Sequence, residues 1–253
     1  MTQFPIHPLE TAPEGSRPYI AAAKAAFGLV PNLVGEFAES PAVIEGYLSL
    51  AAAYQKSGLT PLEREVVLIA AAVENACHYC VAAHTAVTQG QKLDQTVVQA
   101  VRNGGPIADV KLEGLRDFAT RVVRERGWVS DADVNRLIAS GYTAANVLEV
   151  VLGVGLKTIS NYINHIAETP VDAAFQANAF EPRKAAGSIT PNPRAVSGEA
   201  PFDTATGDRA MRFLNILFAL GILGSVILLV SLSGHGTLIN AQSISPTMPA
   251  MLG

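Results

Sequence analysis

Charged side chains are scarce in this sequence of 253 residues, of which Asp, Glu, Lys and Arg make up only 16%. Typical soluble domains carry about 25%. The net charge of −4 lacks the basic surplus that nucleic-acid binding requires, so we expect no nucleic-acid partner. Two cysteines are too few for a disulfide-stapled scaffold, and an apolar share of 49% is too high for a disordered chain. The chain can therefore bury a core.

Charge is absent altogether from residues 213–232, FLNILFALGILGSVILLVSL. A helix of this length spans about 30 Å, the thickness of the hydrocarbon core of a bilayer. A buried core helix is the alternative, but such a helix normally carries a polar stripe. Arg209 and Arg212 precede the run and no Lys or Arg follows it, so the positive-inside rule places the N-terminal part in the cytoplasm. We expect a single-pass protein of the cell membrane.

These features divide the chain into four parts. The first residues show no basic start followed by an apolar run, and we do not interpret them as a signal peptide. We expect a helical domain at 1–180, a Pro- and Gly-rich linker at 181–208, a transmembrane anchor at 209–234 and a short extracytoplasmic tail at 235–253.

The pattern of residues 1–180 predicts an all-α fold. Ala, Leu, Glu and Val dominate, and no alternating strand pattern is bounded by turn residues. The clearest helix start is Thr60-Pro61-Leu62-Glu63, which combines a capping box with proline at the first helical position. Capping residues and apolar periods together predict helices at about 16–27, 32–39, 41–56, 61–89, 94–102, 111–126, 131–139 and 144–166, with a helical turn at 171–178.

Both cysteines fall within the helix predicted at 61–89. Cys77 and Cys80 are i,i+3 neighbours, and Cys80 and His84 are i,i+4 neighbours, so the three share one face of a continuous helix. A cytoplasmic C-x-x-C pair is usually catalytic or metal-binding, and an imidazole one turn from a thiol can take its proton. Glu65 lies on a similar side of this helix but three or more turns away. It could contact His84 only if the helix bends or another chain intervenes.

Two other interpretations of these residues stay open. Free cysteines in a buried helix often serve only as small apolar side chains. Zinc could use Cys77, Cys80 and His84 with a fourth ligand from elsewhere, although structural zinc ligands usually lie on loops and hairpins. No glycine-rich nucleotide loop is present. We expect neither a metal ion nor a bound cofactor.

The motif E-x-x-C-x-x-C-x-x-x-H, which runs from Glu74 to His84, resembles the signature of the alkylhydroperoxidase AhpD-like proteins in the carboxymuconolactone decarboxylase superfamily. The segments GLVPN at 28–32, ERE at 63–65 and NYINHIAETP at 161–170 resemble the peroxidase-related branch. The resemblance implies an all-helical fold and protomers that assemble as trimers or hexamers. The lactone-decarboxylating branch lacks the paired cysteines, which argues against that activity here.

The resemblance also implies roles for four residues. Cys80 corresponds to the attacking cysteine and Cys77 to the resolving cysteine, while His84 corresponds to the proton acceptor and Glu65 to the relay glutamate.

The chain departs from the best-studied branch next to the second cysteine. That branch has a histidine immediately before it, where this chain has Tyr79, and the histidine here is one position earlier, at His78. In a helix His78 points about 100° away from Cys77, towards solvent or an interface. Possible supporting residues of the site are therefore Glu74, His78, Tyr79 and His165.

The function implied is reduction of a hydroperoxide by thiols. The Cys80 thiolate would become a sulfenic acid, Cys77 would close a disulfide, and an external dithiol would reopen it. A non-catalytic accessory subunit of a larger membrane complex is the alternative, because peroxide removal does not require an anchor. The expected partners are a hydroperoxide, a dithiol reductant, the membrane through 213–232, and either further copies of this chain or other subunits of a membrane complex.

Overall fold

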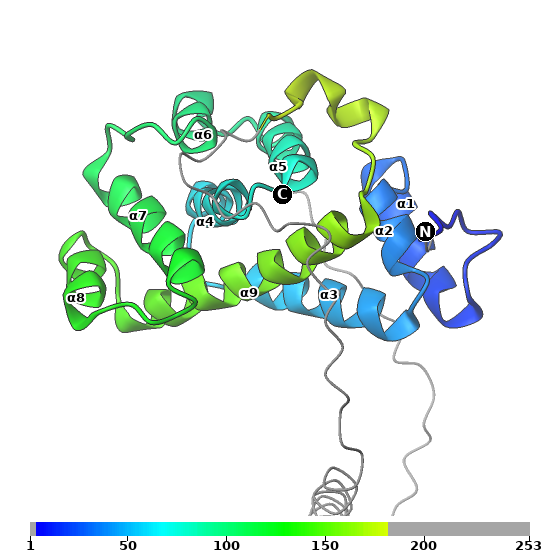
Figure 1. Cartoon of the computed structure of the whole chain (residues 1–253), viewed down its shortest axis with the longest axis horizontal. Coiled ribbons are helices and arrows are strands. Elements are labelled where there is room, and N and C mark those ends of the chain that lie inside the picture. The colour runs from blue at the N-terminus through cyan, green and yellow to red at the C-terminus, as the bar shows by residue number, and fades with distance from the viewer. Residues whose placement is uncertain (1–3, 182–253) are drawn as a thin grey trace, which may run out of the picture. The chain divides into compact units, whose positions relative to one another are not determined.

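A computed structural model of the chain describes residues 4–181, which form nine α-helices, two short 3-10 helices and no β-strand (Figure 1). The all-α prediction is therefore confirmed over these residues. The elements in order are η1 (Glu14–Ser16), α1 (Arg17–Phe27), α2 (Asn32–Phe37), α3 (Pro41–Tyr54), α4 (Pro61–Glu74), α5 (His78–Gly90), α6 (Gln95–Arg102), α7 (Val110–Arg124), α8 (Asp131–Ala139), α9 (Ala144–Ala167) and η2 (Ala173–Asn178).

The predicted anchor at 209–234, with its apolar run 213–232, and the predicted tail at 235–253 lie outside the described residues, as does the linker beyond its first residue. Within the described range, no helix taken singly combines the length and the apolar character needed to cross a bilayer. Helices α8 and α9, which are bent by 112° relative to each other, meet the criteria as a pair by length and composition only.

Most helices begin and end where local sequence signals place them. Glu63 N–H donates to the Thr60 hydroxyl, and the Glu63 carboxylate accepts from Thr60 N–H, so the predicted capping box starts α4. Ser130 starts α8 and Thr143 starts α9 in the same way. These reciprocal bonds satisfy N–H groups that the first turn of a helix leaves without partners.

The prediction of one continuous helix over 61–89 is wrong. The segment forms α4 and α5, which are separated at residues 75–77. Ala76 has a left-handed φ of 55°, its N–H donates to the Val73 carbonyl at 3.0 Å, and Cys77 N–H donates to the Ala72 carbonyl at 2.9 Å. These bonds make a Schellman-type helix ending, in which the left-handed residue is usually glycine. Because residue 76 is alanine, the sequence contains no glycine at this position that would predict the end of α4.

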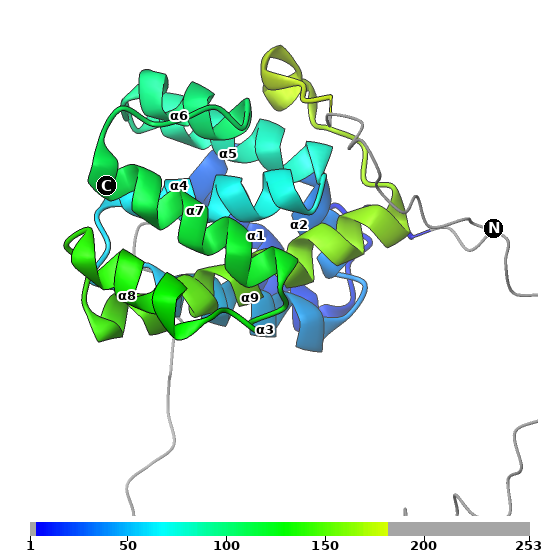
Figure 2. The ribbon, with the colours of Figure 1, turned by 60° about the vertical axis from the view of Figure 1, so that its left-hand side comes forward.

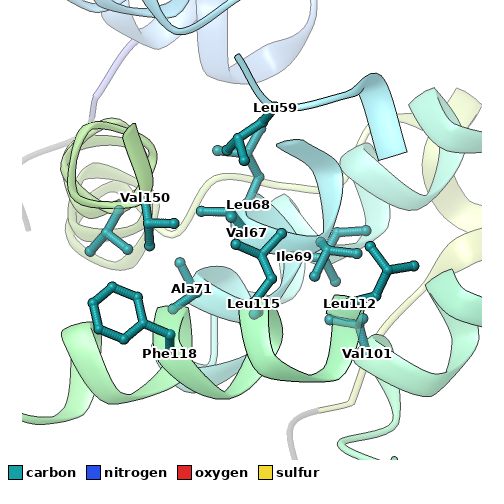
Figure 3. Close-up of a cluster of buried hydrophobic side chains, with 14 of the residues drawn as sticks. Leu59, Val67, Leu68, Ile69, Ala71, Val101, Leu112, Leu115, Phe118 and Val150 are labelled. Atoms are coloured by element: carbon teal, nitrogen blue, oxygen red, sulfur yellow. The ribbon is translucent and has the colours of Figure 1, made fainter. Parts of the chain in front are cut away.

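Helix α4 lies at the centre of the described domain, with α5, α6, α7 and α9 packed against it (Figures 1 and 2). Helices α3 and α9 run side by side beneath it in Figure 1. The main core gathers between these helices, and burial of each large side chain stabilises the fold by about 1.5–3 kcal/mol. Figure 3 shows part of this core, including Val67, Ile69 and Ala71 of α4, Leu115 and Phe118 of α7, and Val150 of α9.

A second buried cluster joins the N-terminal helices to α5. Its members include Ile20 of α1, Phe37 of α2 and Ile44 of α3. Cys77 and Cys80 belong to this cluster. The cysteine pair is therefore positioned inside apolar packing, on the side of α5 that meets the N-terminal helices and α9.

Candidate active site

The break between α4 and α5 sets the position of the two thiols. Cys77 is the N-cap residue of α5, with an extended backbone, and Cys80 lies in the first turn of the same helix. Both cysteines are free and each is only 1% exposed. A thiol in the first turn lies near the positive end of the helix dipole, which favours the thiolate.

The two thiols have opposite acidities. Burial by itself would raise the pKa of Cys80, but the hydrogen bond from the Cys77 thiol and the positive charge of Lys157 outweigh burial and lower that pKa well below its usual value. The pKa of Cys77 is raised, because its proton is held in the hydrogen bond to Cys80 and because it is buried beside a negative charge. The structure therefore favours a thiolate at Cys80 and a thiol at Cys77.

His84 is held between two charged side chains. Its Nδ1 lies 2.8 Å from Oε2 of Glu65 in α4, and its Nε2 lies 2.8 Å from Nζ of Lys157 in α9. A lysine ammonium can only donate, so Nε2 accepts from Lys157 and the proton of the neutral ring is on Nδ1, donated to Glu65. The bend between α4 and α5 brings Glu65 and His84 together, as the sequence required for such a contact.

Two side chains of α9 also reach the sulfur atoms. Nδ2 of Asn164 donates to Cys80 Sγ at 3.1 Å and to Cys77 Sγ at 3.6 Å. Cys80 Sγ lies 3.7 Å from the Ser160 hydroxyl, which also helps to lower the pKa of Cys80. Hydrogen bonds from neutral donors to a thiolate stabilise the anion without a further charge.

Within residues 4–181, none of the possible supporting residues forms a hydrogen bond to either cysteine sulfur. Tyr79 is buried, but its hydroxyl donates to Asp172 at 2.7 Å and accepts from Leu33 N–H at 3.2 Å, so it ties α5 to the start of α2 and to the segment after α9. Glu74 forms a bidentate ion pair with Arg124 of α7, and the residues His78 and His165 are exposed. Partial burial of the imidazole is the main cause that lowers the pKa of His165, with a smaller contribution from His78, while the negative charge of Cys80 acts to raise it.

Sequence reasoning gave no role to Lys157 or Ser160. A usable signal exists in hindsight, because Lys157 is the single charged residue in the otherwise uncharged stretch 150–167 of the longest helix. A lone lysine on the face of a helix that also carries Val150 and Gly153 needs a buried partner. Its partner His84 is 73 residues away, and only the fold brings the two together.

Metal ligation has no support in the described part of the chain. Among residues 4–181, no group of three or more His, Cys, Asp or Glu side chains is gathered as a metal site requires.

Comparison with known proteins gives a family match for part of the chain. Residues 39–110 match the model of the carboxymuconolactone decarboxylase family. The matched carboxymuconolactone decarboxylase segment runs from just before α3 to the start of α7 and includes both cysteines, Glu65 and His84. Lys157, Ser160 and Asn164 lie outside it. No curated protein matches the sequence.

Solved structures resemble the fold over a larger share of the chain. A peroxidase-related protein from Ralstonia eutropha, described as an alkylhydroperoxidase AhpD core, has a TM-score of 0.61 and 24% identity, with 68% of this chain and 93% of that chain covered. A peroxidase-related protein from a Silicibacter species has a TM-score of 0.60 and 19% identity, with 69% and 95% covered. The debrominase Bmp8, bound to 2,3,4-tribromopyrrole, has a TM-score of 0.60 and 14% identity, with 70% and 96% covered. At these identities the likeness establishes the AhpD-like fold and nothing about chemistry.

Proposed function

We propose that this chain is a thiol-dependent hydroperoxide reductase. The observation that carries the proposal is the unequal acidity of the buried cysteine pair, with a stabilised thiolate at Cys80 and a retained proton at Cys77. A thiol peroxidase needs one nucleophile and one resolving thiol within reach, and this asymmetry supplies both. The AhpD-like fold and the carboxymuconolactone decarboxylase segment support a peroxidase-related role.

The reaction has two steps and a reset. The Cys80 thiolate attacks the terminal oxygen of a hydroperoxide, the O–O bond breaks, and an alcohol leaves once it has gained a proton. The Cys77 sulfur then attacks the Cys80 sulfenic acid, the S–O bond breaks, and water and a disulfide form. An external dithiol reduces the disulfide by exchange. His84 and Glu65 relay protons between this site and solvent, which His84 meets with 19% of its side chain exposed.

Two unsatisfied polar atoms on α9 support a polar substrate. Asn164 Oδ1 and Asn161 Nδ2 are buried and have no hydrogen-bond partner among the described residues. Buried polar atoms generally have partners. A hydroperoxide carries a hydroxyl that can donate to Asn164 Oδ1, in the side chain whose Nδ2 contacts both sulfurs, and it carries acceptor oxygens of the kind that Asn161 Nδ2 lacks.

The proposal includes a location. We place the protein at the cell membrane, held by 213–232, with the helical domain in the reducing cytoplasm, where a dithiol reductant can return the pair to the dithiol state.

The direct test is hydroperoxide consumption by the purified chain with a dithiol reductant. We expect wild-type protein to turn over cumene hydroperoxide, and Cys80→Ser to consume none. Cys77→Ser should form one sulfenic acid at Cys80 and then stop, because nothing closes the disulfide. The matched control is Ser57→Cys in a wild-type background, which adds a thiol away from the cysteine pair and should leave turnover unchanged. Equal sulfenate trapping at Cys77 and Cys80, or none with any hydroperoxide, contradicts the proposal.

The second candidate is a non-catalytic accessory subunit of a larger membrane complex. The apolar run 213–232 favours it, because a tether is needed for a membrane partner and not for peroxide removal. Purification in mild detergent distinguishes the two. Stoichiometric co-purification of other chains, together with inert cysteines, would replace the reductase by the accessory subunit.

A further inference from the structure

Lys157 is a buried charge that helps to stabilise the Cys80 thiolate, but the reaction described above gives it no part in proton transfer. Its side chain lies on α9, it is 1% exposed, and its Nζ donates to His84 Nε2 at 2.8 Å. An ammonium removed from water requires compensating negative charge. The groups that face Lys157 are Glu65 from α4, the cysteine pair and His84 from α5, and Tyr47 from α3.

The anion that holds the charge on Lys157 is the Cys80 thiolate. Burial acts to lower the pKa of Lys157, and the charge of Cys80 is the largest effect that raises it, so the net shift is upward. Glu65 is a second anion, but its carboxylate is engaged with Nδ1 of His84, so the imidazole separates it from Lys157. Removal of the thiolate therefore removes the main reason for Lys157 to stay protonated.

We propose that Lys157 is the proton donor of the peroxide step, charged while Cys80 is a thiolate and neutral once the disulfide has formed. The inference rests on the proposed hydroperoxide reductase function for its substrate. It assigns a catalytic residue outside the segment that matches the carboxymuconolactone decarboxylase family.

The atoms and electrons balance with Lys157 in this role. The Cys80 thiolate takes the terminal hydroxyl of the hydroperoxide, the O–O bond breaks, and the departing alkoxide receives a proton from the Lys157 ammonium. Cys77 then attacks the sulfenic acid, and its thiol proton leaves with the hydroxyl as water. The sulfurs have lost two electrons and the peroxide has gained them. The dithiol reductant returns two electrons and two protons, one to Cys77 and one to Lys157.

The first test counts protons and needs no peroxide. The Cys77–Cys80 disulfide of the full chain in detergent is titrated with dithiol redox buffers from neutral to mildly alkaline pH, and the pH dependence of the redox equilibrium gives the number of protons taken up. Thiolate absorbance verifies that Cys80 is ionised in the reduced protein over this pH range. We expect two protons to be taken up per disulfide. Lys157→Arg should take up one, because a guanidinium cannot release its proton. One proton in wild type, or two in both proteins, overturns the inference.

The second test measures the first chemical step. Reduced protein is mixed with cumene hydroperoxide and sulfenate formation is followed. Lys157→Arg keeps the charge beside Cys80 but offers no transferable proton, so we expect a rate roughly 100-fold lower, the usual scale for loss of general acid catalysis. The control Lys24→Met removes an exposed lysine of α1 and should react like wild type. A wild-type rate in Lys157→Arg would reduce Lys157 to an electrostatic role.

The two tests fail in different ways. If wild-type protein reacts with no hydroperoxide, the proposed function fails, while the proton count on the wild-type disulfide still decides whether Lys157 changes its charge with the cysteines. If Lys157→Arg does not fold, as judged by circular dichroism, that wild-type count alone tests the inference, and a value of one overturns it.

Discussion

Burial and charge act in opposite directions on the thiol of Cys80. Burial disfavours the thiolate, while the donors Cys77, Ser160 and Asn164 and the cation Lys157 favour it. The donors and the cation together outweigh burial, so the pKa of Cys80 is lower in the folded state than in the unfolded chain. The stabilisation from this ionised group is complete above the unfolded pKa of a cysteine and is lost as pH falls through the depressed folded pKa.

The first prediction is a pH titration of thiolate absorbance in the reduced protein. At neutral pH we expect the absorbance of one thiolate, lost only in acid because the pKa of Cys80 is lowered. Cys80→Ser should show none at neutral pH. Cys77→Ser should keep it, since a serine hydroxyl can still donate to the Cys80 sulfur. A neutral-pH thiolate that survives in Cys80→Ser would mean that the acidity belongs to Cys77.

At the scale of single residues, the sequence predicts the members of the candidate site better than it predicts their contacts. Cys77, Cys80 and His84 are recognisable because their spacing is local. The contacts of Glu65 and Lys157 with His84 are not, because one depends on a bend and the other on a helix that is distant in sequence. Spacing along one helix specifies which side chains are neighbours, but it cannot specify which helix packs across from them.

Helix α9 approaches α3 at a glycine. A Cβ on Gly153 would lie 2.7 Å from Cζ of Tyr54, which is fully buried, whereas a Cβ on Gly155 would meet nothing within 4 Å. The two glycines are two residues apart in the same helix and have the same backbone preference. Replacing each glycine with alanine therefore measures the steric cost at position 153 separately from the gain in helix propensity at position 155.

The second prediction uses this pair. Gly153→Ala should lower the free energy of unfolding by about 1–3 kcal/mol, because the ring of Tyr54 cannot move without disturbing the core. Gly155→Ala should raise it by about 0.5–1 kcal/mol, since alanine favours the helix. Urea unfolding of both variants measures the difference. Equal effects of the two substitutions would show that α3 and α9 do not pack as described.

The helix boundaries that the sequence predicts best are the helix starts at which a side chain caps the first turn. Thr60, Ser130 and Thr143 each start a helix with a polar oxygen, and the sequence shows this directly. The division of 61–89 is not visible, because a left-handed alanine at position 76 replaces the expected glycine. The energetic cost of that alanine, about 1–2 kcal/mol, is offset by tertiary packing that local patterns do not contain.

The third prediction concerns the whole domain. Both buried clusters lie within residues 4–181, so a fragment 1–181 should fold alone into a helical, cooperatively unfolding domain. The full chain should sediment with membranes, and the fragment should not, because it lacks 213–232. Circular dichroism and membrane fractionation test the two parts. An unfolded or aggregated fragment would place part of the fold in the residues beyond 181.

The fourth prediction concerns self-association. One face of α9 exposes a line of apolar side chains at helical spacing, namely Leu148, Val151, Ile159, Tyr162 and Ile166. An exposed apolar stripe of this length is typical of a protein–protein interface. We expect the fragment 1–181 to be oligomeric by light scattering and the double variant Leu148→Glu, Ile166→Glu to be smaller. The control Glu149→Gln on the neighbouring face should not change its mass.

Cys80 and Lys157 lie on separate stretches of the chain, and this placement has a consequence for inheritance. A gene fragment encoding 39–110 would transfer the thiols, Glu65 and His84 to a new protein, but it would leave Lys157 and Asn164 behind. The recipient would have the recognisable motif and the hydrogen bond from Cys77, but not the Lys157 charge that also lowers the pKa of Cys80. Two proteins can therefore share the motif and differ in the reactivity of their cysteines. The residue at the position of Lys157 in α9, considered together with the motif, would distinguish them.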